Sequence, residues 1–320
     1  VSKRWTKPVR RERAEHRVLV LDGEQRSALA VVRSLGAAGY TVLTGSAAAR
    51  PLAASSRWAR AVPRLPDPLG DAEAYRAEVR ALTLDRGVSA VVPVTEPSAL
   101  ALLPDPALGP RIPMPPPETF DAVNDKVRLL DRATSLDIDV PVSETVSSPD
   151  DAAVGAWRHF PAVVKPGRSV VETAAGREKT SVAFVEDRGD LARTLGALPG
   201  DAFPVMLQER LHGPGLGVFL LLDRGERVAH FAHRRLREKP PQGGVSVYRE
   251  SVEAPADLVE RAERLLQAFD WNGVAMVEFK HDTASGRTAL MEINGRFWGS
   301  LQLAIDAGVD FPRLLLDRFL

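Results

Sequence analysis

The stretch of residues 103–119, LPDPALGPRIPMPPPET, most constrains how this chain can fold. Its seven prolines fix the backbone angle φ and lack an N–H group, so no helix or strand can run through it. We therefore place a domain boundary there, between residues 17–115 and residues 116–320. A chain of 320 residues is long enough to bury the cores of two or three domains.

Apolar strand patterns alternate with helical patterns before this boundary. Strands are predicted at 17–22, 41–44 and 88–94, and helices at 27–38 and 71–86. This order is typical of a parallel α/β sheet. No Gly-x-Gly-x-x-Gly motif follows the first strand, which argues against a nicotinamide dinucleotide site.

Thr95 and Glu96 follow the third predicted strand, at the carboxyl end where open α/β sheets bind ligands. This position makes Glu96 a candidate substrate contact. Capping of a following helix by Thr95 and Glu96 explains the same residues equally well.

The charge balance and the lack of cysteine exclude several classes of function. Lys plus Arg and Asp plus Glu each number 42, so bulk charge does not attract nucleic acid or an anionic membrane. Without cysteine there are no disulfides, thiolate metal sites or cysteine nucleophiles. No apolar run approaches the roughly 20 residues of a membrane helix, and residues 1–16 are interpreted as a solvated basic arm. We expect a cytoplasmic protein that binds neither nucleic acid nor membrane.

Two lysines stand out after the boundary. Lys126 lies inside a helix predicted over 118–135. Lys165 ends a strand predicted over 160–166, where its ammonium group can reach a phosphate. Residues 167–180, which include two glycines, are predicted to form a mobile hairpin loop.

A strand predicted over 205–211 leads into glycines at alternate positions, Gly213, Gly215 and Gly217. Glycine at this spacing allows another group to approach the backbone closely. The remaining predicted elements are strands at 182–185, 218–222 and 228–237 and helices at 190–198, 255–269, 301–307 and 311–320.

A basic cluster closes the strand predicted over 228–237 and precedes a Gly-Gly loop. Arg235 and Arg237, with Ser246 beyond the loop, form a candidate anion-binding or substrate-binding site. A solvated cluster of charges is the commoner explanation of such a pattern.

Two neighbouring predicted strands each carry a glutamate. Glu278 lies in the apolar run 274–279, and Glu292 lies in MEINGRFWGS, residues 291–300. Strand alternation places Asn294, and then Arg296, on the same face as Glu292. Such oxygen ligands suit Mg²⁺, and the arginine could stabilise a developing anion. Acidic side chains at strand ends are also commonly just solvated.

Three motifs in this order and spacing resemble the ATP-grasp superfamily, most closely its carbamoyl-phosphate-synthase-like and carboxylate-amine ligase branch. Residues 163–166 are similar to the family's V-V-K-P, residues 208–213 to its Q-E-x-[IL]-x-G hinge, and residues 291–300 to its E-I-N-P-R-F-x-G-S. No G-x-x-x-x-G-K-[ST] motif occurs, so a P-loop is not available. The resemblance covers residues 17–320.

The resemblance implies an ATP-grasp fold of mixed α/β and α+β class. An N-terminal pre-ATP-grasp, Rossmann-like parallel α/β domain, residues 17–115, would precede the ATP-grasp domain, residues 116–320. In the latter, two α+β subdomains would clamp ATP, with a small lid at about 140–210. The chain ends soon after its signature, whereas many relatives continue with a segment that completes the substrate pocket.

The resemblance also implies roles for individual residues. Lys126 and Lys165 would contact the nucleotide phosphates, and Arg296 would stabilise phosphoryl transfer and the tetrahedral intermediate. The implied sets are Arg296, Arg235 and Arg237 as catalytic residues, Lys126, Lys165, Gln208, Glu209, Arg210 and Leu211 as nucleotide-binding residues, and Glu278, Glu292 and Asn294 as metal ligands.

The implied activity is an ATP-dependent carboxylate-amine, or carboxylate-thiol, ligase on small molecules. It would work through an acyl phosphate and form ADP and phosphate, with ATP and Mg²⁺, or Mn²⁺, as cofactors. The sequence does not fix the oligomeric state, and because relatives commonly dimerise a homodimer is left open. Two alternatives stay open: a regulatory nucleotide-binding module without catalysis, and a kinase-like phosphotransferase.

Three positions depart from the family pattern. Gly295 replaces the usual proline, which predicts a less constrained turn before Arg296. Gly215 stands where some relatives have a ribose-binding carboxylate. The loop over 167–180 has only two glycines, which predicts a weaker hold on the phosphates.

Overall fold

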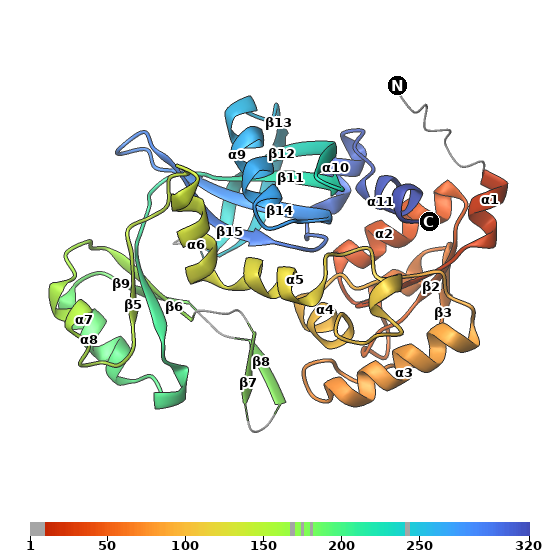
Figure 1. The fold of residues 1–320 in the computed structure, drawn as a ribbon, viewed down its shortest axis with the longest axis horizontal. Helices are drawn as coiled ribbons and strands as arrows, with labels where there is room; N and C mark the ends of the chain where they lie inside the picture. The colour runs from red at the N-terminus through yellow and green to blue at the C-terminus, as the bar shows by residue number, and fades with distance from the viewer. Residues whose placement is uncertain (1–9, 167–169, 174–175, 180–181, 241–243) are drawn as a thin grey trace.

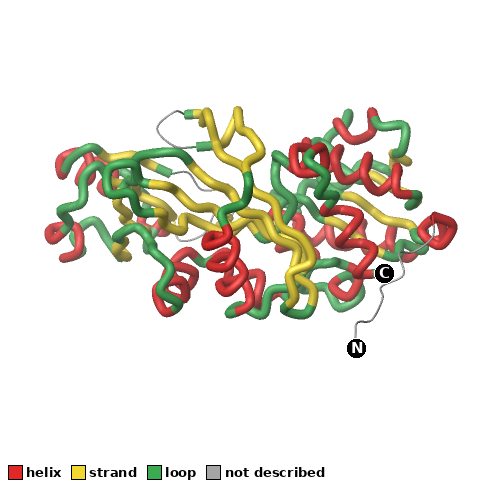
Figure 2. The backbone as a smooth tube through the Cα atoms, turned by 90° about the horizontal axis from the view of Figure 1, so that it is seen from above, coloured by secondary structure: helices red, strands yellow, loops and turns green. Residues whose placement is uncertain are grey.

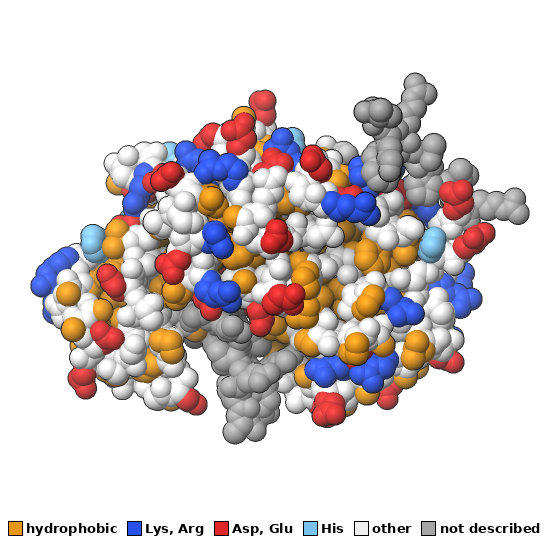
Figure 3. All heavy atoms as spheres, in the orientation of Figure 1, with side chains coloured by type: hydrophobic (Ala, Val, Ile, Leu, Met, Phe, Trp, Pro, Cys, Tyr) orange, Lys and Arg blue, Asp and Glu red, His pale blue; other side chains and the backbone are white. Residues whose placement is uncertain are grey.

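The computed structural model describes residues 10–166, 170–173, 176–179, 182–240 and 244–320 (Figure 1). An N-terminal α/β part, a central five-stranded sheet and a smaller sheet with two helices lie side by side. Viewed from above, the long central strands separate the two outer parts (Figure 2). Charged side chains of both signs are interspersed over one face of the molecule (Figure 3).

The N-terminal part is built on a parallel sheet with the strand order β3-β2-β1-β4. The predicted parallel α/β sheet is therefore confirmed. Its elements are β1 Arg17–Val20, α2 Arg26–Ala38, β2 Thr41–Thr44, η1 Leu52–Ser55, β3 Ala59–Ala61, α3 Ala72–Asp85, β4 Ala90–Val92 and α4 Glu96–Leu102. The sequence did not predict β3, because its three residues, ARA, are exposed or half-buried and carry no apolar pattern.

The proline-rich segment forms a short 3₁₀ turn, η2 Gly109–Arg111, before the chain becomes helical again. The single helix expected over 118–135 is wrong, because the structure has α5 Pro117–Asn124 followed by α6 Lys126–Ser135. Asp125 separates them with φ −81° and ψ 109°, and its carboxylate accepts hydrogen bonds from the N–H groups of Val127 and Arg128. A short acidic side chain that caps a new helix competes with continuation of the old one.

An antiparallel sheet with the order β5-β10-β6-β9 forms the small outer part, here called the lid sheet. Its elements are β5 Ser143–Val146, α7 Ala152–Ala156, β6 Ala162–Pro166, β9 Ala183–Val185, α8 Arg188–Gly196, η3 Gly200–Ala202 and β10 Val205–Glu209. Trp157, Leu191 and Leu207 belong to a hydrophobic core separate from the rest of the molecule. The hairpin expected over 167–180 consists, in its described residues, of β7 Val170–Thr173 and β8 Gly176–Lys179.

The central antiparallel sheet has the strand order β13-β12-β11-β14-β15. Its strands are β11 Gly215–Asp223, β12 Glu226–Lys239, β13 Val245–Val252, β14 Gly273–His281 and β15 Thr288–Asn294. Helix α9 Ala256–Gln267 covers one face through Leu258, Ala262 and Leu265. The same core continues into Leu19 and Val91 of the N-terminal sheet, so the two parts share buried apolar side chains.

The C-terminal helices α10 Leu301–Asp306 and α11 Phe311–Phe319 pack against α2. The basic arm expected over 1–16 is wrong in part, because residues 10–15 form α1 Arg10–Glu15. The Arg13 guanidinium is 9% exposed and forms a 2.6 Å ion pair with Asp317 of α11. Residues 1–9 lie outside the described residues. Across the described part of the chain, no helix has the length and apolar content of a bilayer span.

Candidate functional site

A cavity of about 450 Å³ lies between the lid sheet and the central sheet. The lid sheet contributes Lys165 and, at the end of β10, Glu209, and the segment after β10 contributes Arg210 and Leu211. The central sheet and the segment that follows β15 supply the opposite wall. The cavity therefore joins regions that lie far apart in the sequence.

Strand β14 explains how the central sheet presents charge to this cavity. Val277 and Phe279 point to one face and are fully buried in the core beneath α9. Met276, Glu278 and Lys280 alternate with them and line the cavity. The sequence VAMVEFKH thus produces one apolar face and one face that becomes charged along the strand.

Glu278 and Glu292 are direct cross-strand partners in the β14–β15 pairing. The amide of Asn294 donates a 3.0 Å hydrogen bond to Glu292 Oε1, and Arg296 donates a 3.1 Å bond to Asn294 Oδ1. Arg235 forms an ion pair with Glu278. The structure thus brings together five of the predicted site residues: Glu278, Glu292, Asn294, Arg296 and Arg235.

Burial and the neighbouring charges shift the titration of this cluster. Burial and the charge of Glu292 raise the pKa of Glu278 to about 8, although the charge of Arg235 opposes the shift. Burial acts on Glu292 in the same direction, but its bond from Asn294 and the charge of Lys165 leave its pKa lowered. Two facing carboxylates in one buried site cannot both ionise without a compensating cation.

Lys165 faces these carboxylates from the lid sheet. Burial and the charge of Lys126 lower the pKa of Lys165 to about 8, although the charge of Glu292 opposes the shift. The Lys165 ammonium donates a 2.6 Å hydrogen bond to Gln208 Oε1, and Gln208 is 1% exposed. Gln208 therefore contacts Lys165 inside the lid sheet, while the three residues after it line the cavity.

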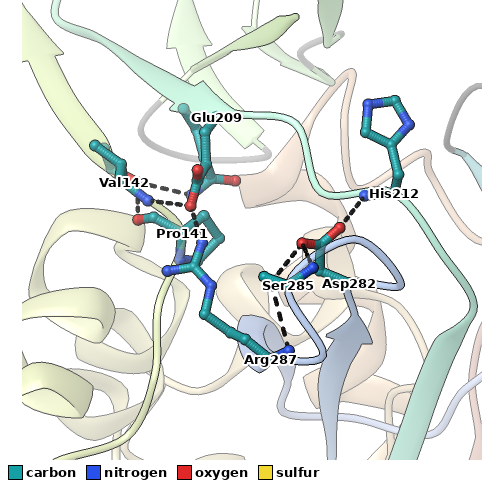
Figure 4. Close-up of polar contacts among 9 residues, drawn as sticks. Pro141, Val142, Glu209, His212, Asp282, Ser285 and Arg287 are labelled. Carbon is teal, nitrogen blue, oxygen red and sulfur yellow. Dashed lines mark hydrogen bonds and ion pairs between the residues drawn. The ribbon is translucent and has the colours of Figure 1, made fainter. Parts of the chain in front are cut away.

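The end of β10 and the segment after it contact the turn between β14 and β15 (Figure 4). The Glu209 carboxylate accepts a 2.9 Å hydrogen bond from the Val142 N–H and forms an ion pair with Arg287. Asp282 accepts a 3.1 Å bond from the His212 N–H, and hydrogen bonding from Ser285 lowers its pKa to about 2. These contacts stabilise the position of the segment that joins the lid sheet to the central sheet.

The alternating glycines of β11 make room for two side chains of β12. A Cβ atom at Gly215 would lie 2.8 Å from Arg235 Cδ, and one at Gly217 would lie 2.8 Å from His233 Nε2. His233 is 2% exposed and contacts Ser300 through Nδ1 at 3.1 Å. Burial lowers the pKa of His233 to about 3, so this imidazole is neutral at physiological pH.

The donor set fits a hard divalent cation. Glu278 and Glu292 supply carboxylate oxygens, and Asn294 supplies an amide oxygen, which are ligand types that Mg²⁺ accepts. Burial and the charge of Glu292 raise the pKa of Glu278, and a bound cation would oppose both effects. No three His, Cys, Asp or Glu side chains gather as a metal site in the described residues, so Asn294 would have to act as the third protein ligand.

Comparison with known proteins identifies this architecture. Residues 201–320 match the family described as ATP-grasp in the biosynthetic pathway with Ter operon. An L-amino acid ligase from Bacillus licheniformis superposes with a TM-score of 0.72 at 15% identity, over 95% of this chain and 74% of that one. The chain has the ATP-grasp fold. The ATP-grasp fold predicted from the sequence is confirmed, and the family match over residues 201–320 agrees with the predicted resemblance.

Two biotin carboxylase structures superpose on the same ATP-grasp core. The Campylobacter jejuni biotin carboxylase–β,γ-ATP complex gives a TM-score of 0.73 at 16% identity, covering 94% of this chain and 70% of that one. The biotin carboxylase domain dimer of Hydrogenobacter thermophilus 2-oxoglutarate carboxylase, with MgADP, ADP and bicarbonate, gives 0.68 at 14%, covering 94% and 69%. Comparison with curated protein sequences gave no match.

The ATP-grasp cavity contains most of the predicted site residues but not all of them. Arg237 is exposed on β12 and does not line it. Lys126 begins α6, and its charge acts on Lys165 and Glu292 from beside the cavity. Thr95 caps α4 by accepting a bond from the Ser98 N–H, and Glu96 does not line the cavity.

Several cavity-lining residues were not predicted as site residues from the sequence, among them His233, Arg249, Lys280 and Trp298. Alternation with Glu278 could have identified Lys280, and alternation with Arg235 could have identified His233. Arg249 and Trp298 gave no comparable signal, because their approach depends on how the strands pair and turn.

Gly295 stands where the family resemblance predicts proline. The space around it is more tightly filled than the sequence predicts. A Cβ atom at this buried glycine would lie 2.2 Å from Trp271 Cη2. Trp271 is 1% exposed in the core beneath the central sheet. The expectation of a loose turn is therefore wrong, because the indole ring occupies the space that a side chain would need.

Replacing Gly295 by alanine or proline is expected to destabilise the protein by about 1–3 kcal/mol, the usual cost of overpacking a core. Urea unfolding measures this loss. Gly299→Ala is the matched control, because a Cβ atom there meets no atom within 4 Å. In the Gly295→Ala background, Trp271→Leu should cost less than it does alone, since the two residues share one space. Equal stability of the Gly295 and Gly299 variants would contradict the packing explanation.

Proposed function

We propose that this chain is an ATP-dependent ligase that joins a small-molecule carboxylate to an amine, with formation of ADP and phosphate. The observation that carries this proposal is the meeting of Lys165, the Glu278–Glu292 pair and Arg296 in one cavity. The confirmed ATP-grasp fold supports it, as does an L-amino acid ligase among the similar structures. ATP is a substrate in this proposal, and Mg²⁺ is the metal cofactor.

The proposed reaction has two steps. A carboxylate oxygen of the acid forms a bond to the γ-phosphorus of ATP, and the bond from that phosphorus to the bridging oxygen breaks to release ADP. The amine nitrogen then bonds to the acyl carbon, the carbon–oxygen bond to phosphate breaks, and the amine proton passes to solvent. The products are an amide, ADP and inorganic phosphate.

Different residues of the chain would carry out different parts of this reaction. Lys165 lowers repulsion among phosphate oxygens, and Glu209, Arg210 and Leu211 offer the backbone edge that would meet the adenine. Glu278, Glu292 and Asn294 would hold Mg²⁺, which neutralises phosphate charge when bound. Arg296 lies where it can stabilise the charge that develops on the reacting group.

ADP release across a panel of amino acids and organic acids, tested singly and in pairs, examines this proposal. We expect ADP and phosphate to form only when an acid and an amine are both present, together with an amide product. AMP and pyrophosphate would contradict the acyl-phosphate route. A stable phosphorylated product without an amine would indicate a phosphotransferase, and nucleotide binding without turnover across the panel would indicate a binding module.

A further inference from the structure

Arg249 lies on β13, at the edge of the central sheet, and its cross-strand partner on β12 is Arg235. Both side chains line the cavity, although like charges placed directly opposite each other destabilise a sheet. Arg235 is neutralised by ion pairs with Glu278 and Glu238. Arg249 forms no ion pair or hydrogen bond with any residue in the described part of the chain.

The surroundings of Arg249 are positive. Burial lowers its pKa, and the positive charges of Arg26 and Arg235 lower it further. Arg26 begins α2 in the N-terminal part, so two separate elements place cations near the same guanidinium. An anion at this place would relieve a repulsion that the folded chain otherwise has to bear.

Two other polar groups along the same cavity also lack partners. The Ser246 hydroxyl, in a residue 7% exposed, and the Trp298 indole N–H, in a residue 2% exposed, have no hydrogen-bond partner among the residues that the structure describes. A buried donor without a partner destabilises the folded chain, so such groups are usually satisfied by a ligand or by water. The Arg249 guanidinium and the Ser246 hydroxyl are both donors on β13, and this wall of the cavity suits a group of acceptor oxygens.

This wall is distinct from the place of phosphoryl transfer. The central sheet runs β13-β12-β11-β14-β15, so three strand spacings separate Arg249 from the strand of Glu278. At about 4.8 Å for each spacing, the two backbones lie roughly 14 Å apart. Arg249 is therefore placed to hold a part of the substrate other than the carboxylate beside Glu278 and Arg296.

We propose that Arg249 binds a second anionic group of the acid substrate, a carboxylate or a phosphate, that does not react. This inference rests on the proposed ligase function and specifies its substrate class as dicarboxylic or phosphorylated acids. The non-reacting anion fixes the distance between the edge of the sheet and the reacting carboxylate, so Arg249 acts as a specificity-determining residue.

Binding measurements test this assignment without requiring turnover. With the nucleotide site filled by Mg²⁺ and a non-hydrolysable ATP analogue, calorimetry compares succinate, glutarate and adipate with butyrate, pentanoate and hexanoate. We expect at least one diacid to bind about 10–100-fold more tightly than its monoacid of equal length, as a charge-assisted hydrogen bond predicts. Arg249→Gln should abolish this difference, and Arg249→Lys should restore part of it.

Arg234→Gln is the matched control, because it removes the same charge from an exposed arginine that pairs with Glu250 outside the cavity. Binding of inorganic phosphate under the same conditions distinguishes a phosphate from a carboxylate as the preferred anion. Equal affinity for diacids and monoacids, no binding of any diacid or of phosphate, or an unchanged preference in Arg249→Gln would overturn the assignment. Diacid binding that depends on Arg249 without ADP release from any acid and amine would instead overturn the ligase proposal alone.

Discussion

Replacing Arg296 by alanine is expected to lower ADP formation about 10³-fold while nucleotide affinity stays within a few-fold of the unaltered protein. The Arg296 side chain is held beside the carboxylate pair by bonds of 3.1 Å to Asn294 Oδ1 and 3.2 Å to the Phe297 carbonyl. Nucleotide contacts are proposed on other elements, around Lys165 and the segment after β10. The arginine should therefore matter for the transition state more than for ground-state binding.

Single-turnover ADP formation and equilibrium binding of a fluorescent ATP analogue separate these two effects. Arg237→Ala is the control, since Arg237 is exposed on β12 and does not line the cavity. We expect that variant to retain normal turnover, although the sequence predicted a catalytic role for Arg237. A large loss of nucleotide affinity in Arg296→Ala, or equal losses of turnover in both variants, would show that the proposed role of Arg296 is wrong.

The central part of the site could be predicted because strand periodicity carries the necessary information. Glu278 was predicted from the neighbouring apolar run that carries it, and strand alternation placed Asn294 with Glu292. The direct Glu278–Glu292 partnership then follows from an antiparallel pairing of neighbouring strands. Local order along the chain sufficed for these residues.

Other features escaped prediction because they depend on contacts distant in sequence. Arg13 appeared to be part of a solvated arm, yet its partner Asp317 lies 304 residues away. The constraint on Gly295 comes from Trp271, which no motif links to it. The bulges near Arg237 shift the register of β12, so position along the strand could not show which arginines face the cavity.

Competition between a polar side chain and the helix backbone explains why one helix was predicted where the structure has two. Periodicity continues through residues 118–135 and therefore favoured one helix. The Asp125 carboxylate instead binds two backbone N–H groups and starts a second helix at Lys126. This break determines where the Lys126 charge lies, since it places the lysine in the first turn of α6.

Replacing Glu292 by glutamine is expected to raise the Mg²⁺ concentration needed for half-maximal ADP formation at least 10-fold and to lower the maximal rate about 100-fold. Glu292 contributes one of the two carboxylates that face each other across β14 and β15, and a neutral amide oxygen in its place binds a hard cation more weakly. Glutamine retains the size of the side chain and an oxygen that can still accept the bond from Asn294. The loss should therefore reflect charge rather than packing.

A Mg²⁺ titration of ADP formation at fixed ATP measures both effects, and a parallel titration with Mn²⁺ tests whether the second ion restores part of the rate. Glu250→Gln is the matched control, because Glu250 pairs with Arg234 on the sheet edge and does not line the cavity. That variant should keep the Mg²⁺ dependence of the unaltered protein. If Glu292→Gln also kept it, the carboxylate pair would not hold the metal, and its burial opposite Lys165 would serve only to neutralise that lysine.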